Sequence, residues 1–328
     1  MGQPRFDVLG IGNAIVDVVA SVDDDFLSRH DLHKGTMRLI SAEQAAALYA
    51  AMPAGQESSG GSAANTCAVA AGLGARVAFL GKVADDQLGA VFRHDITGAG
   101  VYYPTPPLAG AAPTARCLIV VTPDAQRTMN TYLGACVGFE PADLDEAAIR
   151  DSRVVYLEGY LFDPPQAQAA FRRAAELAHQ AGRQVALSLS DAFCVDRHRA
   201  AFRDLVRSHV DILFANETEI CSLYEENEFE NAASRASADV ALAALTRSEA
   251  GSVILRGDER TEVPAAPAHV IDTTGAGDAY AAGFLAAHAQ GRPLAACGRL
   301  GSMAAAAVIE HFGARPRRDL RLLTESAS

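Results

Sequence analysis

The sequence Asp272-Thr273-Thr274-Gly275-Ala276-Gly277-Asp278 joins a short apolar segment, residues 269–271, to an alanine-rich segment, residues 279–287. This order predicts the end of a strand, a glycine-rich turn and the start of a helix. The first N–H groups of a helix lack partners within the helix and carry about half a positive charge. Gly275, Ala276 and Gly277 have almost no side chain, so a phosphate group can approach those N–H groups closely.

Asp278 directly follows this predicted anion hole. A carboxylate in that place suits a general base that deprotonates a hydroxyl while the hole holds the phosphoryl group under attack. The structural alternative is that Asp278 only caps the helix and that the glycines only turn the chain. Asp272 and the two threonines in front of the glycines favour the catalytic interpretation.

Length and composition limit the possible classes of protein. The chain has 328 residues, 49% hydrophobic and 21% charged, which is enough for one large α/β domain or one large and one small domain. A net charge of −12 without a basic stretch argues against nucleic acid as a partner. The chain has no uncharged apolar run of membrane-spanning length and no apolar signal core at residues 1–7, so a cytoplasmic location without membrane partners is expected. The six scattered cysteines predict reduced, mostly buried thiols.

The N-terminal segment predicts two successive strands. Residues 6–12 are an apolar run that ends in glycines, and the β-branched residues after it continue as a strand with Asn13 and Asp17 as polar positions. A dinucleotide-binding turn is disfavoured because Ile15 stands where the third glycine would be. Residues 35–40 predict a partner strand for this segment.

Residues 41–83 predict two helices and a strand. Ser41 and Gln44 have the spacing of a capping box. Residues 58–74 predict a Gly/Ser-rich turn that leads into a helix of small residues, and residues 76–83 predict a strand. Such a helix start lets ligand hydroxyls reach the backbone and the Asn65 side chain, whereas close helix packing is the structural alternative. A P-loop kinase is disfavoured because the glycine spacing of a Walker A motif is missing.

Two β-rich segments, residues 114–121 and 127–133, flank the turn-forming residues 122–126. This pattern predicts a β-hairpin. Together with strands from residues 14–40, the hairpin predicts a small sheet separate from the main one.

From about residue 140, strands and helices alternate. The expected strands are residues 154–157, 184–189, 212–215 and 252–256; the expected helices are residues 165–181, 197–208 and 233–247, one that begins at Asn216, and the alanine-rich stretches 232–250 and 281–307. This alternation predicts a parallel sheet with helices on both faces. Ligands of such sheets bind beyond the carboxyl ends of the strands, so we expect Gly12, Gly81, Asn216 and Gly275 to face one crevice.

Three motifs in this order resemble the ribokinase-like sugar and nucleoside kinases, also called the phosphofructokinase-B family. One family motif is similar to residues 272–280, another to residues 60–66 continuing to 81–89, and the Asn-x-x-Glu motif to Asn216-Glu217-Thr218-Glu219. The resemblance covers essentially the whole chain. Within the family the chain looks most like the adenosine kinases, through residues 12–17, 127–135, 187–193 and 211–219.

The resemblance implies a doubly wound, mostly parallel α/β sheet with helices on both faces and a small β-sheet lid. It implies a single kinase unit over residues 1–328, with the lid at about residues 14–40 and 112–134 and the main α/β domain in the remainder. The implied reaction is transfer of the γ-phosphate of ATP to the 5′-hydroxyl of a nucleoside, with adenosine favoured.

Three alternatives stay open. The acceptor could be inosine or guanosine, or a sugar as in ribokinase and fructokinase. Thr274 argues against the adenosine assignment and favours the monovalent-cation site, because the similar adenosine kinases carry Asn there and ribokinase-type members carry Thr. The non-enzyme alternative, a catalytically silent nucleoside-binding homologue, is disfavoured because the base and the glycines are present.

The resemblance also implies a role for each matching residue. Asp278 is the base, and the N–H groups of Gly275, Ala276 and Gly277 form the anion hole. The residues expected to bind the acceptor are Asn13, Asp17, Gly61, Ser62 and Asn65; those expected at phosphates and ions are Arg127 for phosphate, Asn216 and Glu219 for Mg²⁺ through water, and Asp272 and Thr274 for a monovalent cation. The implied cofactors are therefore ATP and Mg²⁺, with K⁺ as a further candidate. The implied assembly is a monomer or a homodimer.

The motifs do not define the part of the site that would bind the nucleobase of the acceptor as clearly. Tyr160, Phe162, Cys117 and Cys136 are candidates, and core packing is an equally good interpretation of each.

Overall fold

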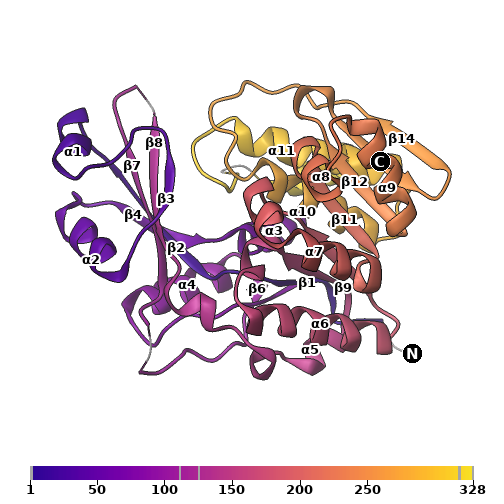
Figure 1. Cartoon of the computed structure of the whole chain (residues 1–328), viewed down its shortest axis with the longest axis horizontal. Helices are drawn as coiled ribbons and strands as arrows, with labels where there is room; N and C mark the ends of the chain where they lie inside the picture. Colours follow the sequence, from indigo (N-terminus) through magenta and orange to yellow (C-terminus); the bar gives the residue numbers. More distant parts are fainter. Residues whose placement is uncertain (1–2, 111, 125, 317–318, 327–328) are drawn as a thin grey trace.

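The computed structural model describes residues 3–110, 112–124, 126–316 and 319–326. Figure 1 shows a large sheet among helices and a smaller sheet at the left of the view. In spatial order the large sheet contains β14 (Glu259–Val263), β13 (Ser252–Arg256), β12 (Leu242–Thr246), β11 (Ile212–Asn216), β10 (Gln184–Ser188), β9 (Ser152–Glu158), β1 (Phe6–Ile11), β5 (Val77–Leu80) and β6 (Val101–Tyr102). The small sheet contains β3 (Met37–Leu39), β8 (Arg127–Tyr132), β7 (Ala115–Val121), β2 (Ile15–Ser21) and β4 (Gln56–Gly60).

The large sheet is mostly parallel. Every pairing from β6 to β12 is parallel, and only β13 and β14 join at the edge as antiparallel strands. Parallel strands need crossover connections, and here helices supply them on both faces. The predicted fold class is confirmed.

Alternate residues of the central strand enter two separate cores. Val8 of β1 packs in one core, and Leu9 and Ile11 pack in the other. The first core contains residues of α3 (Ser62–Gly72), α4 (Gln87–Gly98), α10 (Ala276–Ala289) and α11 (Leu294–Ile309). The second core contains residues of α5 (Glu146–Arg150), α6 (Pro165–Gln180), α7 (Ala192–His209), α8 (Glu217–Tyr224) and α9 (Phe229–Asp239). Because successive side chains of a strand point to opposite faces, the sheet can bury apolar residues under a layer of helices on each face.

The small sheet buries one of its faces and turns the other toward the large domain. Along β2, Val16 and Val18 are buried with residues of α1 (Asp24–Arg29) and α2 (Ala42–Ala51), whereas Asp17 lies half-buried on the opposite face. The hairpin of β7 and β8 and the capping box at the start of α2 are confirmed. Strand β4 occupies residues that the sequence assigned to a turn. The remaining helical segments are η1 (Gly134–Gly138), η2 (Pro141–Asp143), η3 (Gly159–Phe162), η4 (Ser248–Ala250) and α12 (Arg321–Ser326).

One predicted helix is half wrong. The expected helix at residues 233–247 ends with α9 at Asp239, and residues 242–246 form the buried strand β12. Leu242 and Leu245 alone give no clear period, and the alanines between them fit a helix as readily as a strand buried on both faces. The alanine-rich stretch 281–307 is helical, as predicted, except at residues 290–293, which separate α10 from α11.

The strand expected directly before Gly275 is also wrong. Val270 and Ile271 are 58% and 45% exposed and belong to no strand. The segment is held instead by its backbone, because the N–H groups of Ile271 and Asp272 donate to the carbonyl of Ile309 at the end of α11. Gly275 therefore reaches the site from a long loop, and the expectation of a strand end does not hold for it.

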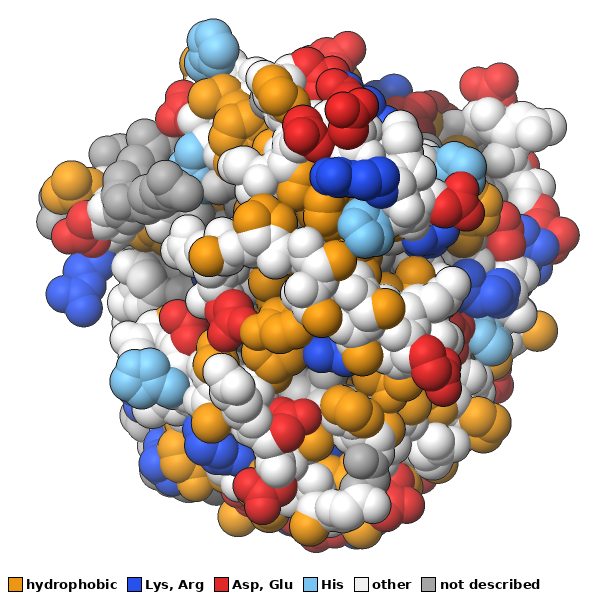
Figure 2. All heavy atoms as spheres, turned by 90° about the vertical axis from the view of Figure 1, so that its left-hand side faces the viewer, with side chains coloured by type: hydrophobic (Ala, Val, Ile, Leu, Met, Phe, Trp, Pro, Cys, Tyr) orange, Lys and Arg blue, Asp and Glu red, His pale blue; other side chains and the backbone are white. Residues whose placement is uncertain are grey.

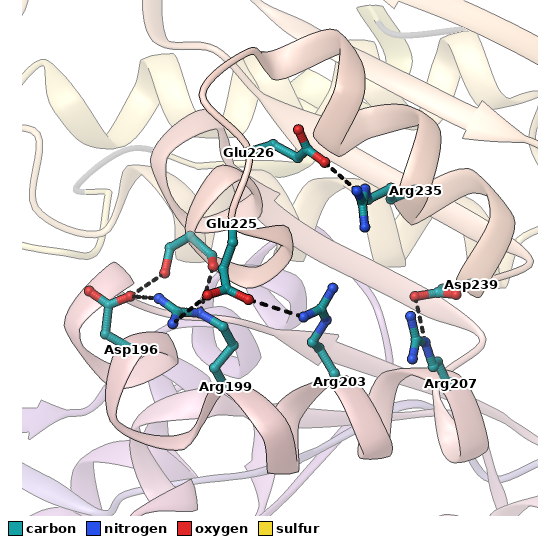
Figure 3. A network of polar contacts seen from close by, with 9 residues as sticks. Asp196, Arg199, Arg203, Arg207, Glu225, Glu226, Arg235 and Asp239 are labelled. Atoms are coloured by element: carbon teal, nitrogen blue, oxygen red, sulfur yellow. Dashed lines mark hydrogen bonds and ion pairs between the residues drawn. The ribbon is translucent and has the colours of Figure 1, made fainter.

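The helices α7, α8 and α9 carry a network of ion pairs on their outer side (Figure 3). Arg199 and Arg203 of α7 both reach Glu225, at 3.5 and 3.3 Å, and Arg207 reaches Asp239 at 3.0 Å. The arginines recur every four residues, so they share one face of the helix. Exposed pairs of this kind contribute about 0–1 kcal/mol each. This network secures helix packing at the surface.

Figure 2 shows the side of the molecule that carries the small sheet, where hydrophobic side chains lie among charged ones. Met37 and Leu39 of the edge strand β3 are 54% and 59% exposed.

All six cysteines are unpaired thiols and only Cys221 is not fully buried, as predicted. In the part of the chain that the structure describes, no helix combines the length and the apolar character that crossing a bilayer requires.

The close contact of α10 and α11 predicts the effect of one substitution. A Cβ atom on Gly283 would lie 2.5 Å from the carbonyl oxygen of Leu300, and backbone cannot move aside cheaply. We expect Gly283→Ala to lower the free energy of unfolding by about 1–3 kcal/mol in urea titrations. Gly98→Ala at the end of α4 is the matched control, because its Cβ would meet nothing within 4 Å. Equal stability of the two variants would contradict this account of the packing.

Candidate functional site

The start of α10 carries the predicted base. Gly275 is the N-cap with φ 78°, and a Cβ there would lie 2.8 Å from the Cα of Ala314, so glycine is needed for both the backbone angle and the space. Gly277 is exposed, with nothing within 4 Å of its Cβ position. The N–H of Ala276 donates to the carbonyl of Thr273 at 3.2 Å, so one of the three predicted anion-hole donors is already engaged within the turn.

The carboxylate of Asp278 faces α3 and does not cap its own helix. Its Oδ1 accepts a hydrogen bond from Ser62 Oγ at 2.6 Å, and its Oδ2 lies 3.5 Å from the donor Nδ2 of Asn65. The capping alternative for Asp278 is therefore wrong. Burial raises the pKa of Asp278 to about 6, although the two hydrogen bonds and the charge of Arg315 act in the opposite direction.

Asp17 lies on the inward face of β2. Burial raises its pKa to about 6, the charges of Arg315 and Arg127 lower it, and the charge of Asp278 raises it. The structure thus brings four of the predicted residues together. Asp17 is close enough to feel the charge of Asp278, and Ser62 and Asn65 contact Asp278 directly. Strand β4 approaches Asp17 closely, since a Cβ on Gly60 would lie 2.4 Å from its Oδ2.

Glu158, at the carboxyl end of β9, is a residue that the sequence analysis missed. Its side chain is 1% exposed and accepts hydrogen bonds from the backbone N–H of Asn13 (3.2 Å), from Asn13 Nδ2 (2.8 Å) and from the N–H of Ala63 (2.7 Å). Burial raises its pKa to about 7. A carboxylate that directly follows an apolar strand was the sequence signal that could have identified it.

Two glycines make room for this arrangement. A Cβ on Gly12 would lie 2.3 Å from the Glu158 carboxylate. Gly61, the N-cap of α3, has φ 99°, and a Cβ there would lie 2.1 Å from the carbonyl oxygen of Asn13. Asn13 is 2% exposed and donates one Nδ2 hydrogen to Glu158, so its Oδ1 is an acceptor that remains for a ligand.

Arg127 and Asp272, predicted to bind phosphate and a cation, bind each other in this structure. Arg127 Nη1 of β8 contacts Asp272 Oδ2, which also accepts from the N–H of Gly313 at 3.0 Å. Asp272 Oδ1 accepts from the N–H and the Oγ1 of Thr274, at 3.0 and 2.6 Å. Burial acts to raise the pKa of Asp272, but these donors and the charge of Arg127 lower it overall. The ion pair joins the small sheet to the loop before α10.

Asn216 and Glu219 form a capping box at the start of α8. Asn216 Nδ2 donates to Glu219 Oε1 at 2.6 Å, and the Glu219 N–H donates to Asn216 Oδ1 at 2.8 Å. Burial raises the pKa of Glu219 to about 7. Each carboxylate oxygen keeps a lone pair, which fits an outer ligand of Mg²⁺ through water. The described residues contain no cluster of three or more His, Cys, Asp or Glu side chains arranged for a metal.

The candidates for the base-binding wall differ in their surroundings. Phe162 is fully buried against Phe171 and Phe202, so core packing is its role. Cys136 is buried and bonds to the carbonyl of Leu133. Cys117 pairs across the small sheet with Asp17. Tyr160 is 39% exposed.

A family model described as pfkB family carbohydrate kinase matches residues 36–319. The chain belongs to this family. It is therefore an ATP-dependent kinase, and the resemblance found in the sequence motifs is confirmed.

Many solved structures match nearly the whole chain, and two of them are about half identical to it. An adenosine kinase from Sinorhizobium meliloti is 51% identical with a TM-score of 0.90, covering 99% of this chain and 100% of that one. A probable sugar kinase from Rhizobium etli CFN 42 is 50% identical with a TM-score of 0.91, covering 99% of each. Among curated proteins, a nucleoside kinase from Methanothermobacter thermautotrophicus is 28% identical over 77% of this chain and 79% of its own.

The raised pKa of Glu158 predicts a dependence of stability on pH. Burial raises this pKa from 4.5 to about 7, so between these values the folded protein keeps a proton that the unfolded chain has released. Ionisation of Glu158 then costs stability as pH rises, and Glu158→Gln removes that cost because glutamine does not titrate. We expect the stability of the wild type relative to this variant to fall by on the order of 1–3 kcal/mol between about pH 5 and pH 7.5.

Urea unfolding at several pH values measures this difference. Glu146→Gln on α5 is the control, because the hydrogen bond from Arg173 lowers the pKa of the exposed Glu146 and places its titration below this range. Parallel curves for the wild type and Glu158→Gln would contradict the assignment.

Proposed function

We propose that this protein transfers the γ-phosphate of ATP to the 5′-hydroxyl of a nucleoside, with adenosine as the preferred acceptor. The observation that carries the proposal is the Asp278 carboxylate at the N-terminus of α10, held by Ser62 and Asn65 of α3. The 51% identical adenosine kinase from Sinorhizobium meliloti supports the choice of acceptor.

Asp278 is the proposed general base. A pKa of about 6 leaves it mostly ionised at neutral pH and yet basic enough to accept a proton from a hydroxyl as the new O–P bond forms. The N–H groups of Gly275, Ala276 and Gly277 are the proposed donors to the phosphoryl oxygens, with the positive end of α10 behind them; the Ala276 N–H would have to leave the Thr273 carbonyl to take part. Charge neutralisation and in-line placement are the main protein contributions to phosphoryl transfer.

The acceptor would lie between the two sheets. Asp17 of β2 and the residues at the start of α3, Gly61, Ser62 and Asn65, are the proposed partners of its sugar hydroxyls, with Asn13 Oδ1 beside them. The segments at about residues 14–40 and 112–134 would act as a lid that excludes water, which competes with the acceptor hydroxyl.

Phosphate binding would change the partner of Arg127. This guanidinium now neutralises Asp272, and turning to an ATP phosphate would leave that carboxylate without its cation. Asp272 and Thr274 are then the residues that would hold a monovalent cation such as K⁺. Asn216 and Glu219 would orient water on Mg²⁺, which supplies further positive charge to the phosphates.

A sugar kinase is the second candidate. The probable sugar kinase from Rhizobium etli is nearly as similar as the adenosine kinase, and Asp17 with Asn65 suits the diol of any furanose. A cytoplasmic location and a monomer or homodimer remain predictions.

The acceptor can be tested with a substrate panel. Purified protein with ATP and Mg²⁺, with and without K⁺, is given adenosine, inosine, guanosine, ribose or fructose, and ADP formation is measured. We expect adenosine to give the highest kcat/KM. Turnover of ribose or fructose without turnover of any nucleoside would overturn the proposed acceptor and favour the sugar kinase.

The role of Asp278 can be tested by one substitution. Asp278→Asn keeps the size and the acceptor for Ser62 but cannot take a proton, so we expect turnover to fall at least about 10²-fold. Binding of adenosine, measured by calorimetry, should be largely kept. Unchanged turnover would refute the assigned base.

A further inference from the structure

Arg315, in the segment after α11, reaches three other elements with one guanidinium. Its Nε donates to Asn65 Oδ1 of α3 at 3.1 Å, and its Nη1 donates to Ser59 Oγ of β4 at 2.8 Å and to Asp95 Oδ2 of α4 at 3.1 Å. Asp95 Oδ2 also accepts from the N–H and the Oγ of Ser59, at 2.8 and 2.5 Å. The side chain is 23% exposed, and burial lowers the pKa of Arg315. None of the motifs in the sequence includes this arginine.

The contact with Asn65 determines how that amide is oriented. A guanidinium has only donors, whereas an amide has a donor end and an acceptor end. Because Arg315 Nε faces Asn65, the amide must present Oδ1 to it and turn Nδ2 the other way. Nδ2 is the atom that faces Asp278 Oδ2. Asn65 is 6% exposed, so water offers it little alternative partner.

We infer that Arg315 is a positioning residue for phosphoryl transfer, which orients Asn65 as a donor to Asp278 and supplies a positive charge to the site. The inference rests on the proposed function, in which Asp278 is the base. Arg315 touches Asp278 only through Asn65, so its effect is on the orientation and the proton affinity of the base.

The charges around Asp278 make Arg315 important there. Acidic groups on three elements interact with it: Asp17 of β2, Glu158 of β9 and Glu219 of α8. The buried phenol of Tyr156 and the partly exposed phenol of Tyr160 also interact with it. Arg315 is the cation that acts against burial to lower the pKa of Asp278. Removing it would leave the base among acids and raise its pKa.

The test compares pH profiles of kcat and kcat/KM for adenosine in Arg315→Gln, Arg315→Lys and Asp95→Asn. In Arg315→Gln we expect kcat to fall about tenfold or more near neutral pH and the acidic limb to move up by about one pH unit. KM should change less than kcat. Arg315→Lys keeps the charge, so its acidic limb should stay close to that of the wild type, although one ammonium cannot hold Asn65 and Asp95 together.

Asp95→Asn is the matched control. It weakens the tie between Arg315 and α4 but keeps the contact with Asn65, so its acidic limb should not move. The inference would be overturned if kcat of Arg315→Gln fell by the same factor at every pH, or if the acidic limb of Asp95→Asn moved as far as that of Arg315→Gln. Either result would mean that Arg315 only holds the packed elements together. If Arg315→Gln does not fold, an acidic limb in Arg315→Lys displaced by a full unit overturns it, and an unmoved limb with lowered kcat supports it.

Failure of the proposed function has a different signature. If the proposed acceptor is wrong, the wild type turns over ribose or fructose and no nucleoside; if the proposed base is wrong, Asp278→Asn keeps its turnover, whatever the Arg315 variants do. An inactive Asp278→Asn together with an unmoved limb in Arg315→Gln rejects only the role of Arg315.

Discussion

A half-buried carboxylate between the starts of two helices is the constraint on which the site depends. Asp278 of α10 can be held there only because α3 comes close enough to offer Ser62 and Asn65. The close approach needs small residues, and the two helices begin with Gly61-Ser62-Ala63-Ala64 and Gly275-Ala276-Gly277. Partial burial favours the protonated form of this carboxylate, and the hydrogen bonds from Ser62 and Asn65 favour its charged form. The pairing of α3 with α10 is thus a requirement of the chemistry as well as of the packing.

The site contains more acids than cations, and this balance explains its pKa values. Burial raises the pKa of Asp17, Asp278, Glu158 and Glu219, each into the range of about 6 to 7. Arg127 and Arg315 offset this only in part, and Arg127 already neutralises Asp272. The proposed base, Asp278, thus has a pKa close to neutral pH. The same excess of negative charge leaves a place for Mg²⁺, which the phosphates of ATP would bring.

Sequence patterns predicted the elements whose periodicity is unambiguous. Residues 165–181 and the β-hairpin at 114–133 have clear helical and strand signals and fold as predicted. The prediction for residues 242–246 was wrong because alanine fits a helix and a strand equally well, and only the position of this segment inside the sheet selects the strand. The prediction of a strand at Val270 and Ile271 was wrong because a short apolar run needs a neighbouring strand to pair with, and the described residues pair no strand with this segment.

The sequence by itself determined the local chemistry: a glycine-rich turn, an aspartate after it and the polar residues at the start of α3, because these are neighbours along the chain. Tertiary structure alone brought in Glu158 and Arg315, which lie 95 and 250 positions from their partners Ala63 and Asn65. It also paired Arg127 with Asp272, two residues that the sequence assigned to separate ligands. Contacts between distant residues follow from how the sheets and helices pack, and no local spacing encodes them.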